Sequence, residues 1–164
     1  MVMIVVNIRE KNIYLDILKL NMKGIKIMEK IIIVRNYLNK LRSKVFLEPI
    51  QEDEFKTLPQ QLEQILILMK ICINVKEDKY LSKDTGIDEE FLSCLRECEI
   101  PVSEDKCELM YFVQCILICK GYESELSGFY SPSTKKGVRK FINDNRIRTG
   151  SLRITSILWE ILFS

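Results

Sequence analysis

The sequence predicts a mainly helical protein. Glycine and proline are scarce among the 164 residues, at 6 and 4, which favours helices with short connections over a many-turned β-sandwich. Apolar residues make up 47% of the chain and charged residues 29%, so the chain can bury a core and stay in solution. From residue 62 onward, apolar residues recur at helical spacing.

The first part of the chain is the hardest to assign. "MVMIVVNI" predicts a short buried strand or an irregular terminus, whereas "MEKIIIVRNYLNKLRSKVF", from Met28, has the apolar spacing of a helix. The span "LEPIQEDEFKTLPQQ" contains Pro49, Pro59 and an acidic run, which is typical of a linker. We therefore expect an uncertain N-terminal segment, residues 1–50, then a helical unit at 51–105 and a further domain at 106–164.

Five more helices are expected, in the order "QLEQILILMKICINV", "KDTGIDEEFLSCLREC", "SEDKCELMYFVQCILICKGY", "SPSTKKGVRKFINDNRI" and "ITSILWEILF". Side-chain oxygens suited to cap a helix start precede three of them, and these are Asp84 or Thr85, Ser103, and Ser131 or Ser133. Gly121 is expected to end the third of these helices.

The chain also shows a weak internal repeat at an offset of 49 residues. Without gaps, this offset places "LEQILILM" on "YFVQCILI", "YLSKDTGIDEEFL" on "FYSPSTKKGVRKF", and "CELMYFV" on "SILWEIL". Identities are few, and both a duplication and a chance alignment of similar helices remain open. A duplication would make residues 58–107 a decayed copy of the C-terminal unit.

Charge and hydropathy narrow the classes of function. The net charge of +2 is too small to indicate nucleic-acid binding, but residues 1–50, 51–105 and 106–164 carry +6, −8 and +4. No run approaches the roughly 18–20 apolar residues of a membrane span. No signal peptide is evident, so we expect a cytoplasmic protein or one released by lysis or non-classical export.

The six cysteines allow three interpretations. Four of them form two Cys-x-x-x-Cys pairs, and each pair would share one helix face. Buried thiols in a reducing compartment are favoured, paired disulfides are the second interpretation, and a metal site is the third. The chain has no histidine and no Cys-x-x-Cys knuckle, so neither metal nor cofactor is expected.

The order of elements in the last third has a parallel in a known family. "KGY" at 120–122, "SGFYSPST" at 127–134, "GVRKFI" at 137–142 and "LWEIL" at 158–162 follow Val113-Gln114 at the spacing of a family pattern. That pattern runs Leu-Gln, "LGY", "DGxFGxxT", "AVxxFQ" and "TWxxL". Residues 106–164 thus resemble the peptidoglycan-binding-like domain, a three-helix cell-wall-binding module.

The resemblance implies non-catalytic binding of peptidoglycan, through its glycan or its stem peptide, by shape and by hydrogen bonds to the loop backbone. The corresponding positions in this chain are Tyr122, Ser127, Tyr130, Ser131 and Thr134. Gly128 is expected to adopt a positive φ. The chain departs from the pattern because Ser127 replaces an aspartate, Ser131 a glycine and Gly137 an alanine, and these changes weaken the carbohydrate-binding interpretation more than the fold.

The aromatic side chains of this region have two possible roles. Trp159 and Phe129 are expected in the core, whereas Tyr122 and Tyr130 could stack on a sugar or be buried. The basic residues that follow the loop are expected to be a solvated helix face, with phosphate binding as the alternative; they are Lys135, Lys136, Arg139, Lys140, Arg146, Arg148 and Arg153.

Two other classes of function remain as alternatives. "YLSKDTGIDEEFLSCLRE" is similar to a helix-turn-helix, but its recognition helix would begin with Asp88, Glu89 and Glu90, which a DNA groove repels. A protein-interaction descendant in the cytoplasm is the form of this alternative that survives. An enzyme is not expected, since the sequence shows no catalytic constellation, although a catalytic partner could be encoded elsewhere.

Overall fold

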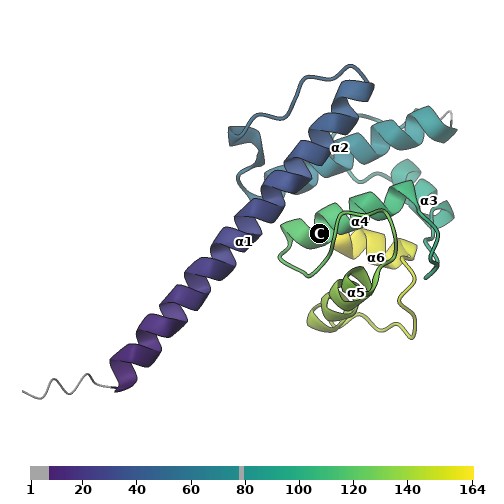
Figure 1. Cartoon of the computed structure of the whole chain (residues 1–164). Helices are drawn as coiled ribbons and strands as arrows, with labels where there is room; N and C mark the ends of the chain where they lie inside the picture. Colours follow the sequence, from purple (N-terminus) through teal and green to yellow (C-terminus); the bar gives the residue numbers. More distant parts are fainter. Residues whose placement is uncertain (1–7, 78–79) are drawn as a thin grey trace, which may run out of the picture.

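The protein is mainly helical, as the composition predicted. The computed structural model describes residues 8–77 and 80–164, and within them one isolated β-bridge, between Ile100 and Ile154, is the only strand-like pairing (Figure 1). The helices are α1 (Ile8–Lys44), α2 (Leu58–Glu77), α3 (Glu89–Glu97), α4 (Glu108–Cys119), α5 (Pro132–Asp144) and α6 (Ser156–Phe163), with a 3₁₀ turn at Asp53–Phe55. None of the described helices has the length and apolarity needed to cross a bilayer.

Helix α4 lies at the centre of the molecule. It packs against α1 and α2 on one side and against α5 and α6 on the other (Figure 1). A helix that is apolar on all sides must be covered on all sides, and nine residues of α4 are buried: Met110, Phe112, Val113, Gln114, Cys115, Ile116, Leu117, Ile118 and Cys119. The central position of α4 therefore follows from its composition.

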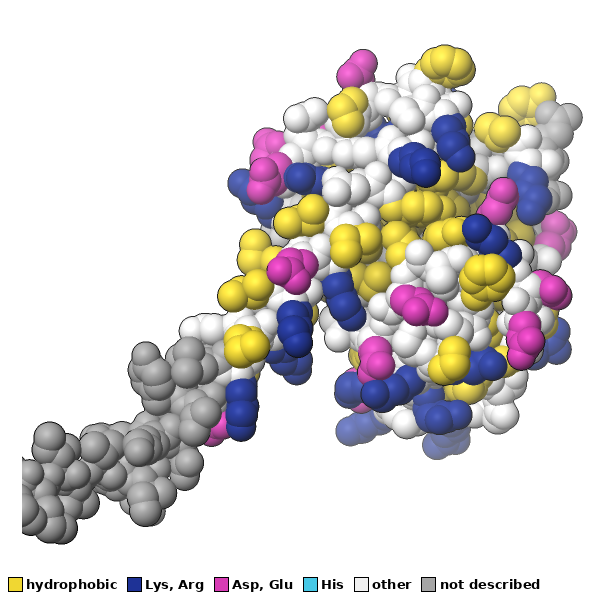
Figure 2. Space-filling view, in the orientation of Figure 1, with side chains coloured by type: hydrophobic (Ala, Val, Ile, Leu, Met, Phe, Trp, Pro, Cys, Tyr) yellow, Lys and Arg dark blue, Asp and Glu magenta, His cyan; other side chains and the backbone are white. Residues whose placement is uncertain are grey.

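Helix α1 is longer than the sequence predicted. It begins at Ile8 rather than near Met28, and the strand considered for "MVMIVVNI" falls on residues 1–7, outside the described residues, apart from Ile8, which is helical. Its C-terminal part packs on the body through Val34 and Leu38, both fully buried. The remainder projects from the body, and hydrophobic side chains stay exposed along it (Figures 1 and 2).

The expected linker is a structured connection with two anchors. The Asn39 amide binds both backbone groups of Ile50: the Ile50 N–H donates to Asn39 Oδ1 at 2.7 Å, and Asn39 Nδ2 donates to the Ile50 carbonyl at 3.4 Å. Gln61 Nε2 donates to the Phe55 carbonyl at 3.0 Å. Ile50 and Phe55 are buried in one hydrophobic cluster that extends from Val34 to Leu162, so the three sequence segments share a core.

The helix caps are partly as predicted. Ser131 caps α5, with its hydroxyl accepting the Thr134 N–H, as expected. The caps expected at Asp84 or Thr85 and at Ser103 are wrong, since Asp88 caps α3 and Cys107 precedes α4. Asp84 instead accepts hydrogen bonds from the Gly86 N–H and the buried Lys70 ammonium, which holds the loop before α3 in place.

Helix α4 ends as expected at Gly121. Gly121 has φ +80°, its N–H donates to Ile118 O at 3.0 Å, and the Tyr122 N–H donates to Leu117 O at 2.8 Å. This pair of bonds is the Schellman motif, which needs a residue with positive φ. No disulfide joins the six cysteines; Cys94, Cys115 and Cys119 are buried and the other three are half-buried.

Candidate functional site

The loop between α4 and α5 is organised around one buried side chain, Gln114. Its Oε1 accepts the N–H groups of Ser127 at 3.0 Å and Gly128 at 2.9 Å. Its Nε2 donates to the Phe129 carbonyl at 2.9 Å and lies 3.1 Å from Thr134 Oγ1. Gln114 is fully buried, so these bonds form in a medium where a lost partner is costly.

Two glycines let the same loop approach its neighbours closely. Gly128 has the expected positive φ, +76°, and a Cβ there would lie 2.4 Å from Cε2 of the Tyr111 ring. A Cβ on Gly137 would lie 1.9 Å from the Glu123 carbonyl oxygen. The loop is therefore packed on α4 and α5 as tightly as its backbone allows.

Three of the predicted ligand-binding residues belong to the internal network of the loop. Thr134 is fully buried, and its Oγ1 lies 3.1 Å from Ser124 Oγ and 3.0 Å from Ser131 Oγ. Ser131 and Ser127 are half-buried, and Ser127 Oγ lies 3.3 Å from Gln114 Nε2. The structure brings these hydroxyls together, but around Gln114 rather than around an open cavity.

The aromatic assignments of the loop are partly reversed. Tyr130 is only 4% exposed and donates its hydroxyl to the Leu152 carbonyl, so its ring is not available for stacking on a sugar. Phe129, expected in the core, is 43% exposed. Trp159 is fully buried, as expected, with its Nε1–H donating to Cys98 O. Tyr122 is half-buried and meets Phe141 edge-on.

The exposed ring of Phe129 has a cationic neighbour. Lys106 Nζ lies 5.9 Å from the centre of the Phe129 ring and 5.5 Å from the centre of the Tyr111 ring, within the range of cation–π attraction. We refer to Phe129, Lys106 and Tyr111 together as the Phe129 ledge. It combines an apolar face with one positive charge at the surface.

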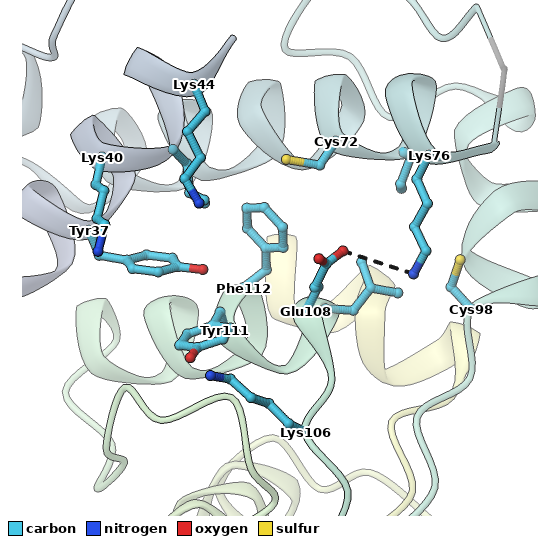
Figure 3. Close-up of a pocket in the computed structure, with 13 residues that line it drawn as sticks. Tyr37, Lys40, Lys44, Cys72, Lys76, Cys98, Lys106, Glu108, Tyr111 and Phe112 are labelled. Atoms are coloured by element: carbon cyan, nitrogen blue, oxygen red, sulfur yellow. Dashed lines mark ion pairs between the residues drawn. The ribbon is translucent and has the colours of Figure 1, made fainter.

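A pocket that the sequence did not predict lies where α1, α2 and α4 meet. Figure 3 shows Tyr37, Lys40 and Lys44 of α1, Cys72 and Lys76 of α2, and Glu108 and Tyr111 of α4 around a common space of about 480 Å³. Lys106 also lines it, so that four lysines and one carboxylate of the described residues surround the cavity. We call this cavity the lysine pocket; no sequence motif marks it, since its charges come from distant segments.

The walls of the lysine pocket are held in place by direct contacts. The rings of Tyr37 and Tyr111 stack with their centres 4.8 Å apart, and Lys76 Nζ lies 3.9 Å from Glu108 Oε2 (Figure 3). Burial raises the pKa of the Tyr37 hydroxyl and of the Cys72 thiol above their ordinary values, with Glu108 adding to the effect on Cys72. Both groups are therefore neutral at physiological pH.

The other basic cluster is partly neutralised. Lys and Arg side chains gather over α5 (Figure 2), where Lys136 pairs with Glu123 at 2.6 Å and Lys140 with Asp144 at 2.8 Å. Arg153 lies 3.6 Å from Glu99. These pairs are exposed, as a solvated helix face would be.

Helix α3 presents carboxylates where a DNA-reading helix would need neutral or basic groups. Its first turn carries Glu89 and Glu90 after the capping Asp88, and all three are exposed. Its buried residues are Phe91, Cys94 and Leu95. The acidic N-terminal end of α3 therefore faces solvent.

No protein-family model, curated protein or solved structure matches this chain.

Proposed function

We propose that this chain is a non-catalytic binding protein for cell-wall peptidoglycan, and that the Phe129 ledge is where the glycan or the stem peptide makes contact. One observation carries the proposal: a loop clamped by Gln114 holds Phe129 exposed beside the Lys106 ammonium. A rigid, exposed aromatic ring beside a positive charge suits a ligand that has apolar sugar faces and carboxylates.

The arrangement of the C-terminal elements supports the resemblance on which this proposal rests. The order of apolar helix, glycine-containing loop, capped helix and last helix corresponds to α4, the loop, α5 and α6. Gln114 and Gly128, two positions of the family pattern, bond directly to each other. The same order of elements also runs through α2, α3 and α4, which is consistent with a duplication.

The spacing within that second series departs from the ungapped repeat. The capping residues Asp88 and Ser131 lie 43 positions apart, whereas the repeat was aligned at an offset of 49. A duplication therefore needs a shift of several residues in the loop after α2.

The predicted loop residues divide into two groups within the proposal. Ser127, Ser131 and Thr134 fix the shape of the loop through their hydrogen bonds. Tyr130 supports the loop from beneath, because its hydroxyl is bound to Leu152. Ligand contact is assigned to Phe129 and Lys106, whereas Tyr122 is half-buried against Phe141.

Retention on purified peptidoglycan sacculi, with duplex DNA at physiological salt as the comparison, tests the proposal. The full chain should sediment with sacculi, and Phe129→Ala should reduce the bound fraction at least fivefold. Tyr80→Ala is the matched control, since Tyr80 is an exposed aromatic residue remote in sequence from the loop. Retention on DNA alone, or equal sedimentation of both variants, would overturn the proposal; retention on neither would favour the protein-interaction alternative.

A further inference from the structure

The lysine pocket is a second candidate site, which adjoins the Phe129 ledge and shares Lys106 and Tyr111 with it. We propose that it binds a small ligand with a flat apolar body and at least two negative charges, the class to which aryl phosphates belong. The pocket is built from α1 and α2 as well as from the start of α4, whereas Phe129 is not among its lining residues. Its volume of about 480 Å³ lies within the range of roughly 300–1,000 Å³ typical of small-molecule sites.

The first argument is the excess of positive charge around the cavity. Lys40, Lys44, Lys76 and Lys106 line it, and Glu108 is the only carboxylate among the lining residues that the structure describes. Glu108 pairs with Lys76, and no carboxylate in the described part of the chain forms an ion pair with Lys40, Lys44 or Lys106. These charges are exposed, and like charges around one concave space create a positive potential that an anion relieves.

The net charge of the side chains that line the pocket indicates the charge of the ligand. The four ammonium groups and one carboxylate leave a local excess of three positive charges. A single carboxylate would neutralise one of them, whereas a phosphate monoester carries nearly two negative charges at pH 7 and accepts several hydrogen bonds. Lysine is a usual partner for phosphate oxygens because its ammonium is a compact charge with three donors.

The second argument is the apolar part of the lining. Ring edges and other apolar surface lie between the lysines (Figure 3), and they come from the Tyr37–Tyr111 stack, Phe112 and Cys72. Leu109 also lines the cavity. The Tyr37 hydroxyl and the Cys72 thiol are kept neutral by burial, so this wall adds no negative charge. A flat apolar body can lie against it while its anionic end faces the ammonium groups.

The third argument is that the walls are fixed before a ligand arrives. Arg42 Nη1 donates to Gln64 Oε1 at 3.1 Å and thereby joins α1 to α2, and the tyrosine stack joins α1 to α4. A pocket whose walls are already ordered loses less entropy on binding. The lysine side chains are the flexible part, and they can adapt to the anion.

Isothermal titration calorimetry with the full chain tests this site. The probe is 1-naphthyl phosphate, compared with neutral 1-naphthol and with inorganic phosphate, in low-salt buffer at pH 7.5. We expect 1-naphthyl phosphate to bind at least tenfold more tightly than either fragment. Equal affinity for 1-naphthol, or no heat of binding up to about 1 mM, would overturn the proposal.

Paired variants separate the pocket from general charge effects. Lys40→Gln combined with Lys44→Gln should weaken 1-naphthyl phosphate binding at least tenfold. Lys23→Gln combined with Lys30→Gln removes the same charge from exposed positions of the same helix and should leave the affinity within about twofold. Equal losses in both double variants would mean that the anion binds non-specifically, which contradicts the proposal.

The two sites can fail separately. Phe129→Ala should leave 1-naphthyl phosphate binding unchanged, and the Lys40→Gln, Lys44→Gln variant should still sediment with sacculi. If the wild-type chain does not sediment with sacculi, the peptidoglycan proposal is overturned, but the proposal for the lysine pocket is not affected.

Discussion

At the scale of single residues, a buried amide replaces the regular backbone bonds that the loop before α5 cannot make. Gln114 binds two N–H groups and one carbonyl of residues 127–129. A glutamine suits this role because its amide both donates and accepts, so it can bind a strand-like backbone edge. The shape of the loop, and with it the exposure of Phe129, depends on this residue.

Replacing Gln114 should therefore destabilise the protein strongly. Gln114→Leu leaves the buried Gly128 N–H without its partner, whereas the Ser127 N–H keeps the Glu125 carbonyl and the Phe129 carbonyl keeps the Ser131 N–H. We expect the free energy of unfolding to fall by about 1–3 kcal/mol. Gln114→Glu keeps the acceptor for Ser127 and Gly128 but loses both donors, and should also destabilise. Urea unfolding followed by circular dichroism measures both values; a loss below about 0.5 kcal/mol in Gln114→Leu would contradict the role assigned to the amide.

At the scale of elements, α5 can lie close to the loop because Gly137 has no side chain. Gly137 lies in the middle of the helix, where glycine costs about 1 kcal/mol relative to alanine. The close approach of the Glu123 carbonyl explains why alanine, the residue of the family pattern, does not occur here. Gly137, where that pattern has alanine, therefore lets the loop and α5 pack closely.

Two glycine-to-alanine variants should consequently have opposite effects. Gly137→Ala places a methyl group against a backbone carbonyl and should cost about 1–3 kcal/mol, despite the better helix propensity of alanine. Gly24→Ala, in α1, meets nothing within 4 Å and should be neutral or stabilise by up to about 1 kcal/mol. Thermal unfolding of the two variants beside the wild type compares them, and a stabilised Gly137→Ala would refute the packing argument.

At the scale of the whole molecule, one core unites segments of opposite charge. The N-terminal and C-terminal segments are basic and the middle segment is acidic, yet all three contribute to the cluster around α4. Both faces of α4 are covered, by α1 and α2 and by α5 and α6. The lysine pocket lies on the side of α1 and α2, and the Phe129 loop on the side of α5.

The C-terminal unit should therefore depend on the rest of the chain for stability. A fragment of residues 106–164 exposes the side of α4 that α1 and α2 cover, and it has few residues with which to build a core of its own. We expect lower helix content per residue and no cooperative thermal transition by circular dichroism, with the full chain as control. A fragment that unfolds cooperatively near the transition of the full chain would contradict this expectation.

The sequence by itself determined the features that depend on neighbouring residues. Helical periodicity identified the six helical regions, Gly121 and Gly128 marked the two positive-φ glycines of the C-terminal unit, and Ser131 marked a cap. Each of these signals acts within one turn or one loop, where a few side chains decide the local backbone. Trp159 is buried, as expected.

Only the tertiary structure decided which side chains face solvent in the loop and which charges meet. Phe129 and Tyr130 are adjacent, and Tyr130 is the buried one because its hydroxyl reaches the Leu152 carbonyl, a partner 22 residues away. The four lysines of the pocket lie as far apart as residues 40 and 106, and helix packing alone brings them around one cavity. Such contacts are set by the way helices cover α4, which local sequence patterns do not encode.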